Sequence, residues 1–277
     1  MCTPTFGQTQ RSASEMKESV LEIHPTAIVH PQAKIAAGVK IGAYSLIGAN
    51  VCIGKDTVIE SQVVIEGWSE IGERCHLFPF VSIGAPPQHL RYRGEPTRVI
   101  IGNDNLIREF VTINRATVEG GGETVLGNNN FIMAYSHIAH DCRVGNQVIM
   151  ANASTLAGHI EVEDFAIVGG LVAIHQYVCV GCYAIIGGAS AVPKDVPPYM
   201  CAAGNRAKLY GLNAVGLKRH HFPEATMAAL KQTYRITFRS HLTLTKAIEK
   251  VHAEVPDLPE ISHFVNFLKK SKRGICR

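Results

Sequence analysis

The sequence predicts an all-β left-handed parallel β-helix followed by a small α-helical C-terminal domain. Aliphatic residues recur every six positions over 23–83, again over 101–113 and once more over 126–192. A period of six fits neither an α-helix nor a half-buried strand. It fits a triangular solenoid in which each unit is one short strand plus a turn, and three units form one coil. After the two prolines at 197–198 the pattern becomes helical.

The β-helix is expected over residues 21–204, with one inward-pointing aliphatic side chain in each unit. Twenty-six such positions, at three per coil, predict close to nine coils. Glycine and Asn or Asp at the corners are expected to supply the backbone angles that tight turns need. Residues 1–20 are predicted to be a disordered tail, because 1–15 are rich in Ser, Thr and Gln and lack a hydrophobic stretch.

Two stretches break the period and are predicted to leave the solenoid as loops. Residues 85–100 are too rich in proline and charge to form a coil. Residues 114–125, which contain three consecutive glycines, shift the register by one. Loops of this length in a compact domain are more often functional than idle, so we expect both to serve function.

Residues 205–277 are predicted to form the α-helical domain. Apolar residues at helical spacing indicate three helices, around 227–238, 247–251 and 261–268. This domain would cap the open end of the solenoid, whose strand edges would otherwise stay unpaired. Its many Lys and Arg side chains are interpreted as a solvated face or as a docking patch for an acidic carrier protein.

Composition limits the partners and the compartment. A net charge of +4 does not argue for nucleic acid, and no apolar run approaches the roughly 18 residues of a membrane span. No secretory signal is recognised, so the eight cysteines are expected to be reduced and the chain cytoplasmic. Cys179 and Cys182 form one C-x-x-C, but a structural zinc site usually needs four ligands, so no metal or cofactor is expected.

The chemical signal is a group of histidines within one section of the repeat. Residues eighteen apart should stack on successive coils about 4.8 Å apart. This places His140 beside Gly158, and Asp141 beside His159. A neutral histidine is the best general base near neutral pH, and Asp141 would orient it or raise its basicity. The Gly158 amide, with no side chain in the way, would meet a developing oxyanion.

Several runs of residues carry a specific resemblance. They read HIAHDC at 137–142, LAGH at 156–159, VAIHQ at 172–176, QHLRY at 88–92, GEPT at 94–97, DVPPY at 195–199 and GLKR at 216–219. In these runs the chain resembles the UDP-N-acetylglucosamine O-acyltransferases that open lipid A synthesis. The similarity extends from Ile23 almost to the C-terminus and includes both loops, so it is far more specific than the hexad repeat alone.

The resemblance implies a reaction and a set of site residues. The family transfers a 3-hydroxyacyl group from acyl carrier protein to the sugar 3-hydroxyl of UDP-N-acetylglucosamine, as a homotrimer with active sites between neighbours and without metal or cofactor. Its catalytic residues correspond to His140, Asp141 and Gly158, and Gly188 corresponds to the end of the acyl groove. The other substrate contacts correspond to Gln88, Arg91, His137, Asn152, His159, His175, Gln176 and Arg219.

The chain departs from the family pattern at a few substrate-facing positions. His89 stands where Asp is usual, Arg91 where Lys is usual, and His220 where a second Arg often follows Arg219. Val215 stands where an acidic residue is often found. These changes leave open whether the accepted sugar is UDP-N-acetylglucosamine or an amino-sugar variant.

Other functions of the same solenoid are weighed against this one. The related N-acyltransferases carry a uridine-binding domain before the repeats, and the start of the period at Ile23 leaves no room for it. The C-terminal helices and the first loop argue against an acetyl-CoA-dependent acetyltransferase. A solenoid carbonic anhydrase with zinc on three histidines, and a non-catalytic binding protein, are the remaining alternatives.

Overall fold

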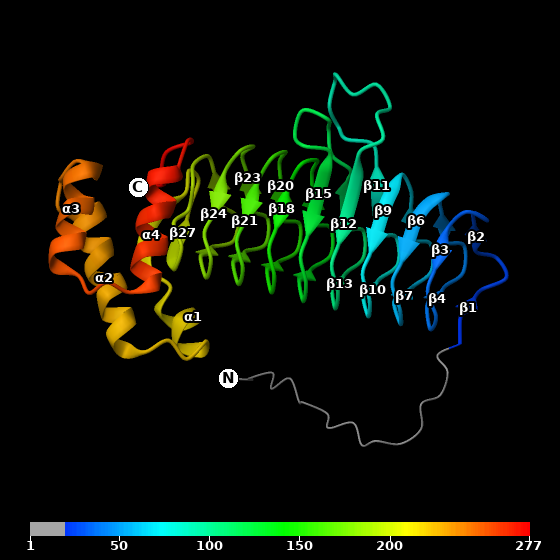
Figure 1. Cartoon of the computed structure of the whole chain (residues 1–277), viewed down its shortest axis with the longest axis horizontal. Coiled ribbons are helices and arrows are strands. Elements are labelled where there is room, and N and C mark those ends of the chain that lie inside the picture. The colour runs from blue at the N-terminus through cyan, green and yellow to red at the C-terminus, as the bar shows by residue number, and fades with distance from the viewer. Residues whose placement is uncertain (1–19) are drawn as a thin grey trace, which may run out of the picture.

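The computed structural model describes residues 20–277, so the predicted tail at 1–20 lies outside the described residues apart from its last residue. Three sheets of short strands wind around a common axis as a left-handed parallel β-helix (Figure 1). Each of the first 26 strands contains one of the 26 aliphatic positions of the hexad period. The predicted fold class is therefore confirmed.

Sheet A has eleven strands and reaches both ends of the solenoid. In spatial order it contains β1 (Glu22–Ile23), β4 (Lys40–Ile41), β7 (Val58–Ile59), β10 (His76–Leu77), β13 (Leu106–Ile107), β16 (Phe131–Ile132), β19 (Ile149–Met150), β22 (Ile167–Val168), β25 (Ile185–Ile186), β27 (Met200–Ala203) and β28 (Lys208–Leu212). All its neighbours pair in parallel except β27 and β28, which pair antiparallel and end the repeat.

Sheets B and C have nine and eight strands. Sheet B contains β2 (Ile28–Val29), β5 (Leu46–Ile47), β8 (Val64–Ile65), β11 (Ser82–Ala85), β14 (Thr112–Asn114), β17 (His137–Ile138), β20 (Thr155–Leu156), β23 (Ala173–Ile174) and β26 (Ala191–Val192). Sheet C contains β3 (Lys34–Ile35), β6 (Asn50–Ile53), β9 (Trp68–Ile71), β12 (Arg98–Ile101), β15 (Glu123–Leu126), β18 (Arg143–Val144), β21 (Glu161–Val162) and β24 (Cys179–Val180).

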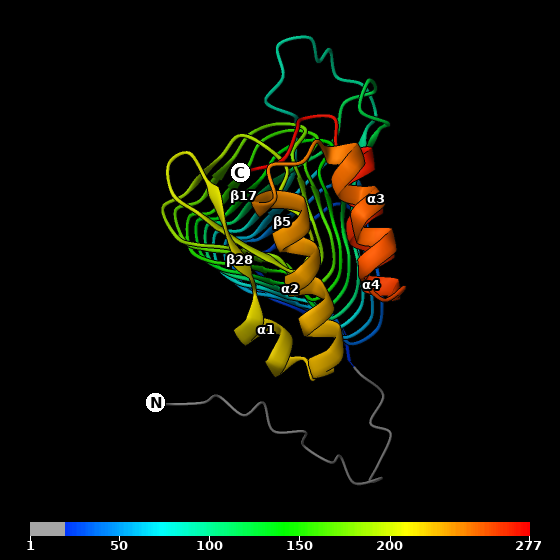
Figure 2. The ribbon, with the colours of Figure 1, turned by 90° about the vertical axis from the view of Figure 1, so that its left-hand side faces the viewer.

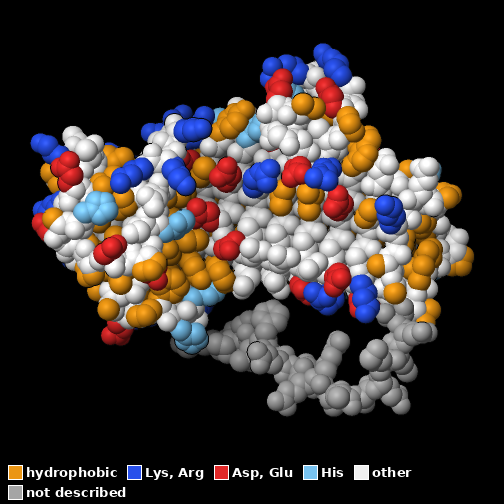
Figure 3. All heavy atoms as spheres, in the orientation of Figure 1, with side chains coloured by type: hydrophobic (Ala, Val, Ile, Leu, Met, Phe, Trp, Pro, Cys, Tyr) orange, Lys and Arg blue, Asp and Glu red, His pale blue; other side chains and the backbone are white. Residues whose placement is uncertain are grey.

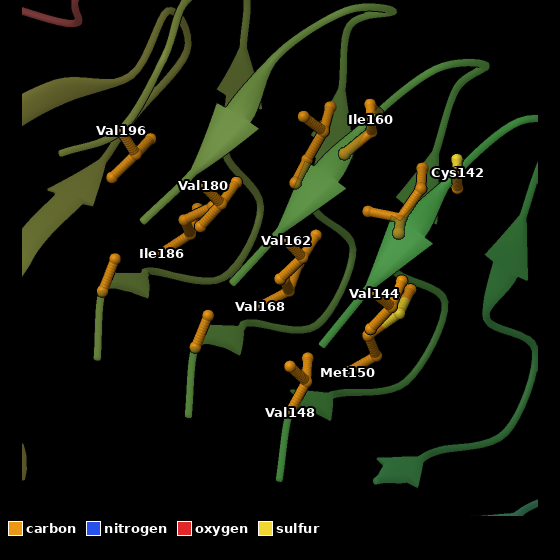
Figure 4. Packing of buried hydrophobic residues seen from close by; sticks show 14 of the residues in the cluster. Cys142, Val144, Val148, Met150, Ile160, Val162, Val168, Val180, Ile186 and Val196 are labelled. Atoms are coloured by element: carbon orange, nitrogen blue, oxygen red, sulfur yellow. The ribbon is translucent and has the colours of Figure 1, made fainter. Parts of the chain in front are cut away.

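The core is a set of aliphatic stacks along the solenoid axis. Val144, Val162 and Val180 pair in register on successive coils of sheet C and are at most 3% exposed. Figure 4 shows them facing Met150, Val168 and Ile186 of sheet A across the interior. Each such side chain stabilises the fold by about 1.5–3 kcal/mol through burial, so the repeat replaces a single globular core.

Glycines that follow the aliphatic residues have a different role from the predicted one. The corner residues with positive φ are mostly not glycine, and from 129 to 189 one recurs at every sixth position, including Tyr135, Phe165 and Leu171. Gly42 and Gly54 are needed for another reason: an added Cβ would lie 2.6 Å and 2.5 Å from the backbone of the next coil. Close coil-to-coil approach, not turn geometry, excludes side chains there.

Both loops leave the solenoid at the corner between sheets B and C. Residues 86–97 connect β11 to β12, and residues 115–122 connect β14 to β15, and both project from the same side (Figure 1). They are shorter than the predicted 85–100 and 114–125, because residues 98–100 and 123–125 pair as strands of sheet C. Val99 and Ile101 are buried there, which explains why these residues return to the coil.

Four helices lie at the C-terminal end of the solenoid: α1 (Ala214–Arg219), α2 (Glu224–Arg239), α3 (Leu244–Glu254) and α4 (Pro259–Lys270). Figure 2 shows α2, α3 and α4 across the end of the coils. The three predicted helices correspond to α2, α3 and α4, whereas α1 and strand β28 were not predicted. Strand β28 continues sheet A past residue 204, so the structure shows no break between the solenoid and the helices at that point. The boundary between 204 and 205 remains a prediction.

None of the helices within residues 20–277 is both long and apolar enough to cross a membrane.

Candidate active site

The predicted catalytic residues lie at the corner between sheets B and C. This corner follows β17, on the coil after the one that carries the second loop. Strands β17, β20 and β23 lead into this corner on three successive coils. The corner residues Asp141, His159 and Tyr177 have φ values of 63°, 61° and 64°, in the left-handed region. His140 and Gly158 immediately precede two of them, so the winding of the chain brings these groups together.

His140 and Asp141 form a buried hydrogen-bonded pair. Nδ1 of His140 lies 2.6 Å from Oδ2 of Asp141, and the Asp141 side chain is fully buried. Thr117, on the second loop, donates its backbone N–H and its hydroxyl to the same carboxylate, at 2.9 Å and 2.8 Å. Burial raises the pKa of Asp141, but the hydrogen bonds from His140 and Thr117 outweigh burial and hold that pKa below its usual value.

This pair defines the tautomer of the histidine. A carboxylate only accepts hydrogen bonds, so Nδ1 of His140 carries the proton that it donates to Asp141. Nε2 is left with a lone pair and is the atom that can take a proton from a substrate. The His140 residue is 8% exposed, so the base is shielded from solvent.

The predicted stacking of coils eighteen residues apart is confirmed at this corner. His137 pairs with Thr155, and Nε2 of His159 lies 3.6 Å from Oδ2 of Asp141. A Cβ added to Gly158 would lie 2.6 Å from Cε1 and 2.9 Å from Nε2 of His140, so the glycine backbone is in direct contact with the imidazole. Within residues 20–277, no backbone or side-chain acceptor takes the Gly158 N–H.

The two flanking histidines are held in the neutral form. Nδ1 of His137 lies 2.7 Å from the Thr112 hydroxyl oxygen, and burial followed by the proximity of His140 lowers the pKa of His137. Burial also lowers the pKa of His159, and this effect outweighs the attraction of Asp141. Both rings therefore serve as hydrogen-bonding groups at neutral pH.

The first loop contacts the site from the N-terminal side of the solenoid. The ring of His89 lies edge-on to His140, with centroids 5.3 Å apart. Gln88 is exposed beside it, and Nη2 of Arg91 lies 2.6 Å from Oε2 of Glu119 on the second loop. Charged side chains of both signs gather at the tips of the loops (Figure 3). The loops thus form a polar wall beside the histidine corner.

Two predicted substrate contacts lie two coils beyond the catalytic pair, toward the C-terminal end of the solenoid. His175 and Gln176 are exposed at the same corner, one coil beyond Gly158. Nη2 of Arg273, from the C-terminal segment, lies 3.0 Å from Nδ1 of His175. The C-terminal segment therefore reaches the rim of this corner.

The structure does not gather the remaining predicted residues around His140 in one chain. Asn152 and Gly188 lie at the corner between sheets A and B, at the other edge of sheet B. Gly170 lies on the coil between them. An added Cβ would lie 3.2 Å from the Asn152 carbonyl oxygen at Gly170, and 3.2 Å from the Gly170 carbonyl oxygen at Gly188. Arg219 ends α1, on the far side of the C-terminal strands from the loops (Figure 1).

Sequence reasoning missed two side chains of the site. Tyr177 stacks on His159 with ring centroids 4.5 Å apart, and a further step of eighteen residues from His159 would have found it. Thr117 holds Asp141, but it lies on the second loop, where the eighteen-residue rule does not apply. No signal in a single sequence identifies such a loop contact.

The fold and the histidine corner define the class of hexapeptide-repeat transferases. The family model described as bacterial transferase hexapeptide (six repeats) matches residues 22–55 and 123–158. A second model, described as UDP N-acetylglucosamine O-acyltransferase, domain 2, matches residues 195–276.

Comparisons with whole proteins identify the family. A curated acyl-(acyl-carrier-protein)–UDP-N-acetylglucosamine O-acyltransferase from Syntrophobacter fumaroxidans is 51% identical over 93% of this chain and 100% of its own length. A relative of the same name from Thermodesulfovibrio yellowstonii is 59% identical over 76% of this chain and 82% of its own. The crystal structure of LpxA, a UDP-N-acetylglucosamine acyltransferase from Bacteroides fragilis, matches with a TM-score of 0.90 and 42% identity, over 92% of this chain and 99% of that one. The chain belongs to the acyl-(acyl-carrier-protein)–UDP-N-acetylglucosamine O-acyltransferase family.

Proposed function

We infer that this chain transfers an acyl group from acyl carrier protein to a hydroxyl of UDP-N-acetylglucosamine, the first step of lipid A biosynthesis. Family membership over more than nine tenths of the chain supports the reaction. The observation that supports the mechanism is the buried His140–Asp141 pair in contact with the Gly158 backbone. A carbonic anhydrase site is less well supported, because the group at this corner that could hold a metal contains two histidines rather than three and the relatives are acyltransferases.

The geometry supports general-base catalysis of acyl transfer. Nε2 of His140 takes the proton of the sugar hydroxyl while the hydroxyl oxygen attacks the thioester carbonyl carbon. The Gly158 N–H donates to the oxyanion that develops on the carbonyl oxygen. When the tetrahedral intermediate collapses, the carbon–sulfur bond breaks and the carrier thiolate receives the proton from His140. Asp141 stabilises the imidazolium that exists between these two steps.

We assign the donor as a 3-hydroxyacyl carrier protein and the acceptor as the sugar 3-hydroxyl. The test is an acyl-transfer assay of the purified chain with 3-hydroxyacyl carrier proteins of several lengths, and with UDP-N-acetylglucosamine or its 3-amino analogue. Transfer to the hydroxyl sugar is the expected result. Transfer to the amine alone would establish the amino-sugar alternative, which the unusual His89 beside His140 leaves as the second candidate.

We further propose that the chain acts as a homotrimer with its sites between neighbours. Phe80, Phe110 and Tyr135 stack along the corner between sheets A and B, with centroids 4.7 Å and 4.8 Å apart, and they are 41–62% exposed. An apolar ladder of this kind on the surface suits burial against another chain. Asn152 and Gly188 lie along the same corner. A neighbouring chain that covers this corner would therefore bring its own His140 close to them.

Mixing two inactive variants is expected to restore activity if the site needs two chains. We would combine His140→Ala chains with Arg219→Ala chains, unfold and reassemble them, and measure acyl transfer. If each site takes His140 from one chain and Arg219 from its neighbour, random assembly of an equal mixture leaves both residues intact in about one quarter of the sites. Activity no higher than that of the separate variants, or full wild-type activity from a monomer, would contradict the proposal.

Gly188 is expected to set the length of the acyl chain. It lies 48 residues beyond His140, about 2.7 coils, which corresponds to an axial rise of roughly 13 Å and suits a medium-length acyl chain. The glycine leaves that end open, so a chain longer than ten carbons should be preferred, by roughly fourfold per buried methylene.

Gly188→Met should shift the preference toward shorter acyl chains by well over tenfold, measured as a ratio of kcat/KM values. An added Cβ meets only Gly170 backbone atoms, the nearest at 3.2 Å, so the variant should fold. Gly48→Met, on an N-terminal coil, is the control. If Gly188→Met keeps the parental length profile, the groove ends elsewhere.

The proposed compartment is the cytoplasm. Each cysteine within residues 20–277 is a free thiol, and Cys75, Cys142 and Cys276 are buried. Free thiols are typical of reducing compartments. Acyl carrier protein, the proposed donor, would have to be available in the same compartment.

A further inference from the structure

A second group of metal-binding side chains lies where the helices meet the solenoid. Glu163 follows β21, and Cys182 follows β24 on the next coil, both at the corner between sheets C and A. His263 comes from α4. A ring nitrogen of His263, the thiol sulfur of Cys182 and a carboxylate oxygen of Glu163 all lie within 4.8 Å of one another. This corner is distinct from the one that holds His140.

Hydrogen bonds hold the Glu163 carboxylate between the other two residues. Oε2 of Glu163 accepts from the Cys182 backbone N–H at 2.7 Å and lies 2.8 Å from Nε2 of His263. The His263 and Glu163 side chains are 41% and 35% exposed, so an ion can reach the group from solvent. The carboxylate is thus fixed between one ligand from the solenoid and one from a helix.

The surroundings of the group favour a cation. Cavities of about 600 Å³ and 160 Å³ share Glu163 and His263 in their walls. The other charged residues that line them are four acids and one base: Glu161, Asp164, Asp195, Glu260 and Lys270. Figure 3 shows acidic side chains where the helices meet the solenoid.

We propose that Glu163, Cys182 and His263 bind a Zn²⁺ ion that joins α4 to the solenoid. Thiolate sulfur, imidazole nitrogen and carboxylate oxygen are the ligand types that Zn²⁺ takes in proteins. The thiolate and the carboxylate neutralise the charge of the ion, and water completes the tetrahedron. Bond lengths of about 2.0–2.3 Å separate tetrahedral ligands by roughly 3.3–3.6 Å, so His263 and Glu163 move apart by about half an ångström when the ion replaces their shared proton.

The other cysteine of the C-x-x-C motif is not a ligand. The Cys179 thiol lies outside the group of side-chain atoms that come within 4.8 Å of one another, and its backbone N–H donates to Oδ1 of Asp195 rather than to Glu163. The sequence argument against zinc counted pairs of cysteines, whereas the structure supplies Cys182 with a carboxylate and an imidazole instead.

Cobalt binding tests the site directly, because a bond between Co²⁺ and a thiolate gives an intense charge-transfer absorption. We would titrate the reduced full chain with Co²⁺, and expect one ion per chain with this absorption, displaced by Zn²⁺. Cys182→Ser should abolish the absorption, and His263→Gln should weaken binding at least about tenfold. Cys179→Ser is the matched control and should bind Co²⁺ like the parent. The group formed by His140, Asp141 and His159 contains no sulfur, so it adds nothing to this signal.

Thermal unfolding provides a second readout that does not depend on activity. Saturating Zn²⁺ should raise the unfolding midpoint by about 5 °C in the parent and in Cys179→Ser, but not in Cys182→Ser or His263→Gln. All four proteins should melt alike in a chelator, which checks that the variants fold. The proposal is overturned if the parent gives no thiolate absorption, if the absorption survives Cys182→Ser, or if Zn²⁺ raises the midpoint equally in all four.

Discussion

Replacing His140 by alanine is expected to lower turnover by at least about 10²–10⁴-fold while the chain stays folded. Nε2 of His140 is the atom placed to take the hydroxyl proton, because Nδ1 is held by Asp141 at 2.6 Å. The neighbouring rings of His137 and His159 do not replace it, since neither has a buried carboxylate that holds the opposite nitrogen at hydrogen-bond distance. The measurement is kcat with saturating donor and sugar.

An exposed histidine provides the control for this experiment. His252→Ala, on the outer face of α3, should keep normal turnover. Far-UV circular dichroism and the thermal midpoint should match the parent for both variants. Near-normal turnover in His140→Ala would show that His140 is not the general base. His137 would then be the next residue to test.

Gly158→Ala is expected to lower kcat by about 10²–10³-fold with little loss of secondary structure. The added methyl group would lie 2.6 Å from Cε1 of His140, well inside van der Waals contact. The imidazole cannot move away without losing its hydrogen bond to Asp141. The same change also disturbs the amide that we assign to the oxyanion, so both halves of the mechanism are affected at once.

Gly48→Ala is the matched control for this second prediction. Gly48 follows its aliphatic residue on an N-terminal coil, and its added Cβ would lie 3.3 Å from the nearest atom. The control should therefore keep nearly normal kcat and fold. Normal kcat in Gly158→Ala would show that the contact relaxes without cost and that Gly158 is not part of the catalytic machinery.

Much of the fold and of the catalytic corner could be predicted because the repeat is regular. Wherever two coils follow without a loop, an eighteen-residue step places one residue beside another, as His137 and Thr155 show. The same rule brought Gly158 to His140. It does not apply across the loops, where the step rises to 30 residues between Ile83 and Ile113 and to 25 between Ile113 and Ile138.

Other features depend on contacts that periodicity does not encode. Gly42 and Gly54 were expected to serve turns, but the corner angles are adopted by other residue types and the glycines serve coil packing. Strand β28 could not be predicted because its antiparallel pairing with β27 breaks the hexad pattern. The position of Arg219 relative to a site cannot follow from one chain if the site is built from two.

The two loops show how this architecture separates shape from stability. They add 12 and 7 residues to the normal eighteen-residue step, yet the strands beyond them resume the same register with Ile113 and Ile138 fully inside. A coil only requires that the chain return to the corner it left, and doubling the length of such an excursion costs only about 0.6 kcal/mol of closure entropy. The two loops beside the histidine corner can therefore be lengthened, shortened or exchanged, while the axial stack that fixes His140 against Gly158 remains unchanged.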